Sequence, residues 1–165
     1  MSSVHSHATD HGWVTVGVDD SPGSRAALVY AASEAVLRGA ELHILCAWSM
    51  PGGHTGHASV PGPLRDACLE DAQGVLGRLA AEVLVDFPGL PYVLTVVEPP
   101  AAHALVEASE RADLVVVGSR GHGGFAGLLL GSVSQRVVHR AHCPVVVVGP
   151  IDDDVEHHAP MSEAR

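Results

Sequence analysis

Short apolar, valine-rich runs alternate with longer segments of helical period along most of this chain. Strands are expected at 13–19, 41–48, 92–98, 113–118 and 144–149. The intervening segments repeat apolar residues every three or four positions and predict helices that begin after Ser21 and span 64–87, 100–112 and 132–142. Strands that are apolar on both faces and separated by helices indicate a parallel sheet with helices on both sides. The fold class is therefore a doubly wound, Rossmann-like α/β domain.

This domain is expected over residues 13–150. The segment 1–12 and the acidic segment 151–165 contain no periodic apolar pattern and are expected to be mobile tails. Within the domain, Ser21 is a good N-cap, Pro22 suits a first helical position and Gly39 suits a left-handed helix end. Gly74 and Gly77 fall inside the 64–87 helix and are expected to bend or weaken it.

The charge balance excludes several classes of partner. The 165 residues include 9 arginines, no lysine and 19 acids, for a formal net charge of −10. Such a chain has no basic surface for DNA or RNA. No apolar run is long enough to span a membrane, and the first twelve residues do not look like a signal peptide. Three separate cysteines, Cys46, Cys68 and Cys143, fit small core residues in the reducing cytoplasm.

A glycine-rich loop carries the main chemical signal. The stretch "GSRGHGGFAGLLLGS" at 118–132 joins the end of a strand to the start of a helix. Ligands of open α/β sheets bind at such strand ends, and the unpaired N–H groups of a helix start attract phosphate. A ligand that comes close to the backbone of this loop would leave no room for side chains, which explains the glycines at 118, 121, 123, 124 and 131.

The end of this loop also fits a simple helix cap. Ser132 followed by Gln135 forms a capping box, which needs no ligand, so a phosphate seat and a cap both remain open at this point. A Walker loop is excluded because the chain has no lysine. A dinucleotide fingerprint is excluded because no acid follows about 20 residues later. His139, His142 and Cys143 suggest a zinc site only weakly, since a fourth ligand is missing.

The same loop resembles that of the universal stress proteins, whose ATP-binding members carry G-x-x-G, nine residues, then G-[ST]. This chain has Gly118-Ser119-Arg120-Gly121, nine residues, then Gly131-Ser132. The longer stretches "VVVGSRGHGGFAGLLLGSVSQRVVHRAHCPVVVV" and "VGVDDSPGSRAAL" look like the C-terminal and N-terminal signatures of the family. The resemblance covers about residues 13 to 149.

The resemblance implies a strand order of 3-2-1-4-5 and an adenine nucleotide as ligand. It places Asp19 beside the ribose and the backbone of Ala47 beside the adenine. The ribose and phosphates would lie along Gly118, Gly121 and His122, and the helix start at Gly131, Ser132, Val133 and Ser134 would hold the phosphates. Gly17, Ser119, Arg120 and Gly123 complete the expected site, with Arg120 either pairing with phosphate or facing water.

Two positions depart from the common pattern of the family. Asp20 stands where many relatives have glycine, which adds negative charge that either weakens anion affinity or favours a bound Mg²⁺. The turn Glu98-Pro99-Pro100 replaces a commoner glycine-containing one.

The expected function is therefore that of an ATP-binding stress-response module with little or no hydrolysis, with AMP and cyclic AMP as alternative ligands. The rivals are a slow ATPase or nucleotidyl-transfer enzyme, and a partner-binding stress domain that takes no nucleotide. Without a lysine or an obvious base, phosphoryl-transfer charge has little to stabilise it. A homodimer is expected through the fifth strand, where Val145, Val146, Val147 and Val148 leave an unprotected sheet edge.

Overall fold

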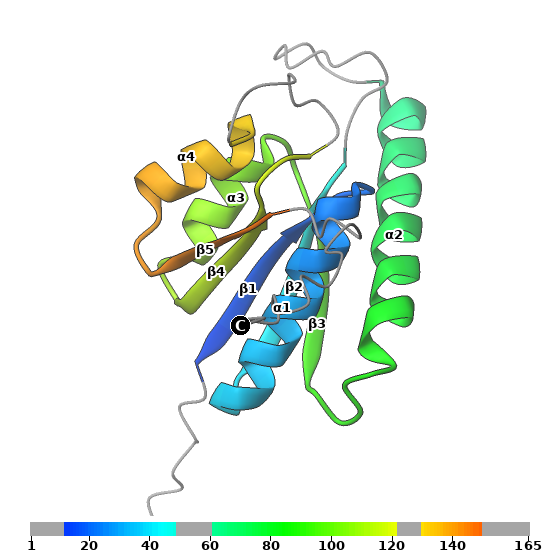
Figure 1. The fold of residues 1–165 in the computed structure, drawn as a ribbon. Coiled ribbons are helices and arrows are strands. Elements are labelled where there is room, and N and C mark those ends of the chain that lie inside the picture. The colour runs from blue at the N-terminus through cyan, green and yellow to red at the C-terminus, as the bar shows by residue number, and fades with distance from the viewer. Residues whose placement is uncertain (1–11, 49–60, 122–129, 150–165) are drawn as a thin grey trace, which may run out of the picture.

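The computed structural model describes residues 12–48, 61–121 and 130–149. Five parallel strands form one sheet in the order β3-β2-β1-β4-β5, which confirms the expected fold class and strand order (Figure 1). The strands are β1 (Trp13–Val18), β2 (Glu41–Ala47), β3 (Tyr92–Val97), β4 (Ala112–Gly118) and β5 (Val145–Val148). The helices are α1 (Pro22–Arg38), α2 (Gly62–Leu84), α3 (Ala101–Ala108) and α4 (Ser132–Arg140).

The sheet lies between two helical layers, with α1 and α2 on one face and α3 and α4 on the other (Figure 1). Strand β4 shows why its run is apolar at every position. Leu114 and Val116 belong to the core under α1 and α2, whereas Val115 and Val117 belong to the core under α3 and α4. A central parallel strand must be apolar on both sides because both sides are covered.

Most helix ends follow the local sequence. Pro22 opens α1, and Gly39 ends it in the left-handed region with φ 62. Helix α2 continues unbroken through Gly74 and Gly77, because its buried face packs on the sheet and outweighs their low helix propensity. Helix α3 stops at Ala108, short of the expected residue 112. Among the described residues, no helix is long and apolar enough to cross a membrane.

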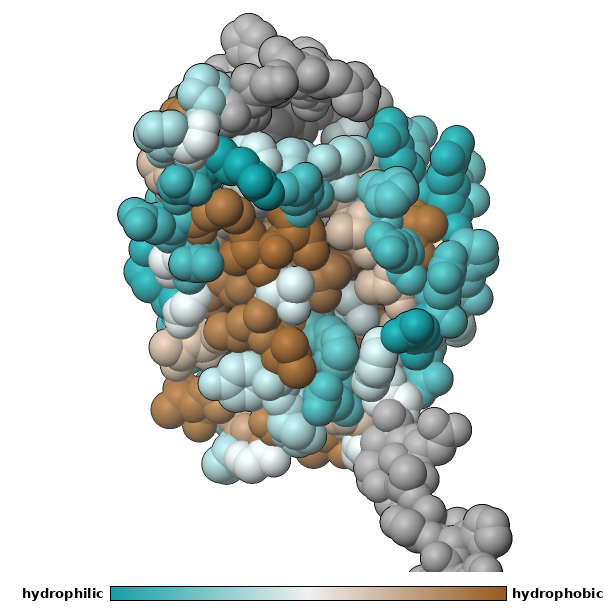
Figure 2. All heavy atoms as spheres, turned by 180° about the vertical axis from the view of Figure 1, so that it is seen from behind, coloured by the Kyte–Doolittle hydropathy of each residue, from teal (hydrophilic) through white to brown (hydrophobic). Residues whose placement is uncertain are grey.

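The expectation of two buried faces is wrong for β3. Tyr92, Val93 and Leu94 are 49%, 40% and 39% exposed. Strand β3 packs on β2 and α2, while the short helices α3 and α4 lie over the other end of the sheet. Leu94 lies on the α2 side of the strand, so the open face of β3 is the opposite one, where Val93 and Thr95 are exposed. Figure 2 shows an apolar area in the centre of the molecule seen from behind. An exposed apolar area of this kind is a candidate contact surface.

Candidate functional site

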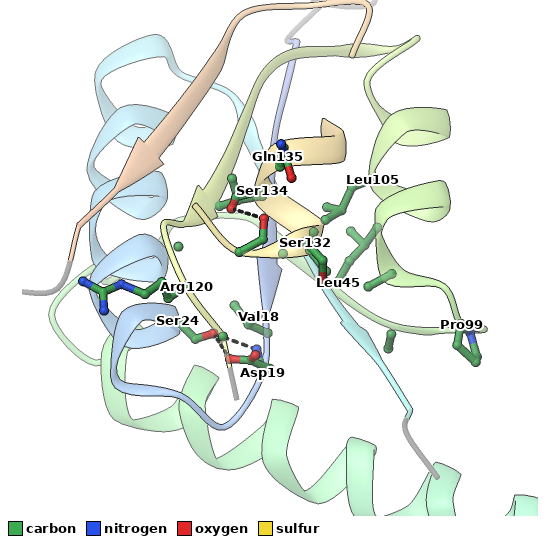
Figure 3. Close-up of a pocket in the computed structure, with 18 of the residues that line it drawn as sticks. Val18, Asp19, Ser24, Leu45, Pro99, Leu105, Arg120, Ser132, Ser134 and Gln135 are labelled. Carbon is green, nitrogen blue, oxygen red and sulfur yellow. Dashed lines mark hydrogen bonds between the residues drawn. The ribbon is translucent and has the colours of Figure 1, made fainter. Parts of the chain in front are cut away.

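A hollow of about 620 Å³ opens at the carboxyl ends of β1, β2 and β4 (Figure 3). This volume lies within the range of about 300–1,000 Å³ typical of small-molecule sites. Most residues expected from the sequence come together in its lining: Gly17, Asp19, Ala47, Gly118, Arg120, Gly121, Gly131, Ser132, Val133 and Ser134. Ser119 is not among the lining residues, and His122 and Gly123 lie outside the described residues.

The two ends of the glycine loop are tied together by backbone hydrogen bonds. The N–H of Gly131 donates to the carbonyl of Ser119 at 2.7 Å, and the N–H of Ser119 donates to the carbonyl of Val148 at 2.7 Å. The buried hydroxyl of Ser134 lies 3.0 Å from the carbonyls of Ser119 and Gly131. Ser119 and the hydroxyl of Ser134 therefore position the loop against the start of α4.

The start of α4 presents backbone donors to the hollow. Its first helical hydrogen bond runs from the N–H of Gln135 to the carbonyl of Gly131 at 2.9 Å, so the N–H groups of Ser132, Val133 and Ser134 precede the helical ladder. The N-cap is Gly131, and no side chain caps this helix. The capping-box alternative is therefore wrong, because Ser132 is already the first helical residue. Its hydroxyl group lies in the wall of the hollow instead (Figure 3).

The glycines of the loop are required for different reasons. A Cβ at Gly118 would lie 3.2 Å from the backbone C and O atoms of Gly23, at the start of α1. A Cβ at Gly121 would lie 2.5 Å from Oδ2 of Asp19. At Gly131 the nearest atom is Cα of Arg120 at 3.5 Å, which is an ordinary contact. Gly118 thus lets β4 approach α1, whereas a larger residue at Gly131 would extend into the wall of the hollow.

Asp19 follows β1 and holds the beginning of α1. Its Oδ1 accepts hydrogen bonds from the hydroxyl of Ser24 at 2.6 Å, from the N–H of Ser21 at 3.0 Å and from the Ser21 hydroxyl. The Ser24 oxygen in turn accepts a hydrogen bond from the N–H of Asp19 at 2.7 Å. The sequence alone did not point to Ser24; its place in "DDSPGS", five residues after the acid that follows a strand, was the available signal. This network fixes the carboxylate at the hollow (Figure 3).

The inner wall of the hollow is apolar. Leu45, Val97 and Leu105 line it, and Ala47 at the end of β2 lies beside them. A Cβ at Gly17 would come within 2.7 Å of Cδ1 of Leu105, so the glycine allows α3 to pack closely on β1 at this point. A flat, weakly polar ring fits a wall of this kind.

Charges of both signs lie near the hollow, and most of them are carboxylates. Burial, together with the negative charges of Asp19, Asp71 and Asp20, raises the pKa of the Cys46 thiol to about 11, and burial is the largest of these causes. Arg120 is an exposed cation in the lining. An anion bound here would therefore be attracted by the start of α4 and by Arg120 and repelled by the nearby carboxylates.

A metal centre made of protein ligands has no support in the described part of the chain. Within residues 12–48, 61–121 and 130–149, no three His, Cys, Asp or Glu side chains are grouped closely enough to hold an ion. His139 Nδ1 lies 2.7 Å from the carbonyl of Gln135. The His139, His142 and Cys143 motif therefore does not form a site.

Comparison with known proteins places this geometry in a family. Residues 13–149 match the model of the universal stress protein family. The universal stress protein Rv2005c of Mycobacterium tuberculosis is 41% identical over 137 residues, which are 83% of this chain and 45% of that protein. The chain thus spans about half the length of this relative.

Solved structures agree with the sequence match. A universal stress protein in complex with cAMP is 30% identical with a TM-score of 0.56, over 85% of this chain and 98% of that one. The protein UspA from Lactobacillus plantarum is 25% identical with a TM-score of 0.66, over 84% and 97%. A five-stranded sheet in this order, a glycine loop before α4 and these relatives lead to one conclusion: the chain belongs to the universal stress protein family.

Proposed function

We propose that this stress-response protein binds an adenine nucleotide in the hollow at the carboxyl ends of β1, β2 and β4. The observation that carries the proposal is the start of α4, where the N–H groups of Ser132, Val133 and Ser134 precede the helical ladder at the wall of the hollow and Gly131 adds no side chain beside them. A relative that is 30% identical was solved in complex with cAMP, which supports the same class of ligand.

Each part of the nucleotide has a matching surface. The adenine would lie against the apolar wall of Leu45 and Val97, with the backbone of Ala47 at its edge. The ribose would lie between Gly17 and Asp19. The phosphates would follow Gly118, Gly121 and Gly131 to the start of α4, with Ser119 and Ser134 positioning the loop. His122 and Gly123 are proposed to complete the phosphate contacts.

The charges near the hollow set the expected affinity. Among the described residues of the lining, Arg120 is the cation and Asp19 is the acid; Asp20, the next residue along the chain, is exposed outside the lining. A triphosphate would thus be held with micromolar or weaker affinity. Mg²⁺ that accompanies ATP would offset part of its charge, and the exposed carboxylate of Asp20 is the oxygen ligand that such an ion would find here. AMP and cyclic AMP carry less charge and remain the alternative ligands.

Little hydrolysis is expected at this site. The chain has no lysine to stabilise a transferring phosphoryl group. Asp19, the acid in the lining, is engaged by Ser21 and Ser24, so it is not set up as a base for an attacking water. A slow ATPase or nucleotidyl-transfer enzyme is therefore the second candidate. We place the protein in the cytoplasm, in keeping with its three unpaired cysteines.

Mass spectrometry of nucleotide released from the purified protein, followed by calorimetry with ATP, AMP, cyclic AMP and GTP, tests the proposal. An adenine nucleotide in the released fraction and heat with at least one adenine nucleotide, but not with GTP, would support it. A folded protein that gives no heat with any of them would leave the nucleotide-free partner-binding domain as the better description. Rapid multiple-turnover phosphate release would favour the enzyme.

The assembly state is a separate part of the proposal. Strand β5 ends the sheet, is uncharged and has no proline within Val145–Val148. Its outer edge is proposed to pair with the β5 strand of a second copy around a two-fold axis, which would satisfy the backbone groups of both edges.

A further inference from the structure

Strand β3 is the other edge of the sheet formed by the described residues, and its own six residues carry none of the charges or prolines that usually protect an edge. Its six residues are uncharged, contain no proline and pair with β2 in an unbroken register. Tyr92, Val93 and Leu94 are 49%, 40% and 39% exposed, whereas all four residues of β5 are half-buried. An exposed apolar edge of this length invites another strand.

The backbone groups of β3 point alternately toward β2 and toward the open edge of the sheet. The N–H of Leu42 donates to the carbonyl of Pro91 at 2.9 Å, and the N–H of Trp48 donates to that of Val97 at 3.3 Å. In a parallel ladder, alternate residues of a strand bond to the same neighbour. Val93 and Val97 therefore face β2, and Leu94, one residue out of step, presents its N–H and C=O to the open edge. An extended backbone matches donors and acceptors at this spacing.

A groove runs beside this edge. It measures about 400 Å³ and is lined by Leu69, Gln73 and Leu76 of α2 and by Leu94, Thr95 and Val96 of β3. Alternate side chains of an added strand would enter the groove, and the others would lie beside Val93 on the open face of the sheet. The groove favours apolar side chains, and the open face, which carries Val93 and Thr95, favours β-branched ones.

The charges around the edge are mostly negative. Glu41 lies near its amino end and Glu98 follows its carboxyl end; both are at least 40% exposed, and Glu98 pairs with Arg65. On α2, Asp66 and Glu70 are exposed one turn before Leu69 and Gln73, which line the groove. Basic residues at both ends of an added strand would complement these carboxylates.

A second copy of the chain is a poor occupant of this edge. In a two-fold pairing, each copy would bring the exposed carboxylates of Glu41 and Glu98 to the shared edge, where they would lie near those of its mate. If β5 pairs with its mate, a second two-fold pairing at β3 would also extend the assembly into an open filament. We propose that β3 is the docking edge for an extended apolar segment of a different protein, flanked by lysine or arginine, which adds a sixth strand to the sheet. The proposal does not depend on nucleotide binding.

A labelled peptide tests this on the full chain. The probe has alternating valine and threonine between two lysines at each end and is followed by fluorescence anisotropy. Binding is expected with the unmodified chain and at least tenfold weaker with Leu94→Lys, which places a cation at the groove. The matched control is Val36→Lys, which adds the same charge at a residue of α1 that is 54% exposed and does not line the groove. This variant should bind the probe normally.

Amide hydrogen exchange by NMR gives a readout that is specific to strand addition. The peptide is expected to slow exchange of the Leu94 and Val96 amides at least tenfold and to leave the Val93 amide, already bonded to β2, unchanged. No binding by the unmodified chain, or equal binding by Leu94→Lys, would overturn the proposal. Protection of Leu94 that rises with protein concentration in the absence of peptide would show a second copy on the edge and would also overturn it.

Discussion

Replacing Gly131 offers the most direct test of the phosphate seat. A Cβ at this position meets Cα of Arg120 at 3.5 Å, the carbonyl oxygen of Ser119 at 3.6 Å and the nitrogen of Gly121 at 3.7 Å. These are ordinary contacts, and the backbone at φ −74 and ψ 168 suits any L-residue. Gly131→Leu should therefore change the free energy of unfolding by no more than about 1 kcal/mol, or a few degrees in Tm.

The effect on nucleotide binding should be much larger. The leucine side chain would extend between the glycine loop and the start of α4, where the N–H groups of Ser132 and Val133 are proposed to bind phosphate. A hydrogen bond to a charged group nets about 1.5–3 kcal/mol, so the loss of two weakens binding about 10²–10⁴-fold. Gly131→Ala adds one methyl group at the same point and should weaken binding less.

Calorimetry with ATP and thermal unfolding followed by circular dichroism measure the two effects on the same samples. The expected result is a folded Gly131→Leu variant without detectable heat and a folded Gly131→Ala variant with reduced affinity. Gly118→Val is the contrasting variant: its Cβ would press on the backbone of Gly23 at 3.2 Å, so its stability should fall together with its binding. If Gly131→Leu stays folded and binds ATP like the unmodified chain, the phosphates do not lie at the start of α4.

Three further outcomes are expected. Ser24→Ala removes the 2.6 Å hydrogen bond to the Asp19 carboxylate and the 2.7 Å hydrogen bond that the Asp19 N–H donates, so the free energy of unfolding should fall by about 2–3 kcal/mol; an unchanged Tm would contradict this network. The pKa of Cys46 is raised from 9.0 to about 11, so between these pH values the folded state keeps a proton that the unfolded state releases, and the free energy of unfolding should fall as pH rises through that interval. Urea titrations at several pH values should therefore show a steeper decline in the free energy of unfolding with pH for the unmodified chain than for Cys46→Ala. An equal decline for both would refute this. Light scattering should give about twice 17.0 kDa for the unmodified chain and a monomer for Val147→Glu, whereas a monomeric unmodified chain would rule out pairing through β5.

Much of the site was predictable because its signals are local. Gly118, Gly121 and Gly131 mark a strand end, a loop and a helix start within fifteen residues, and these steps fix where a phosphate seat can lie. Asp19 likewise directly follows a strand. The strand order followed from the resemblance to a family and not from periodicity, which gives the elements without their neighbours.

The sequence also determined the elements themselves, since burial on both faces leaves an apolar run that can be read without any partner, as in β4. Only the tertiary structure showed which distant residues contact one another. Gly118 is needed because Gly23, nearly a hundred residues earlier, comes within 3.2 Å of its would-be side chain. The same kind of run in β3 is exposed at Val93 because α3 and α4 do not cover that face of the strand, and at Leu94 because α2 covers the opposite face only in part. How far a helix extends over a sheet depends on packing between distant segments, which no local pattern records.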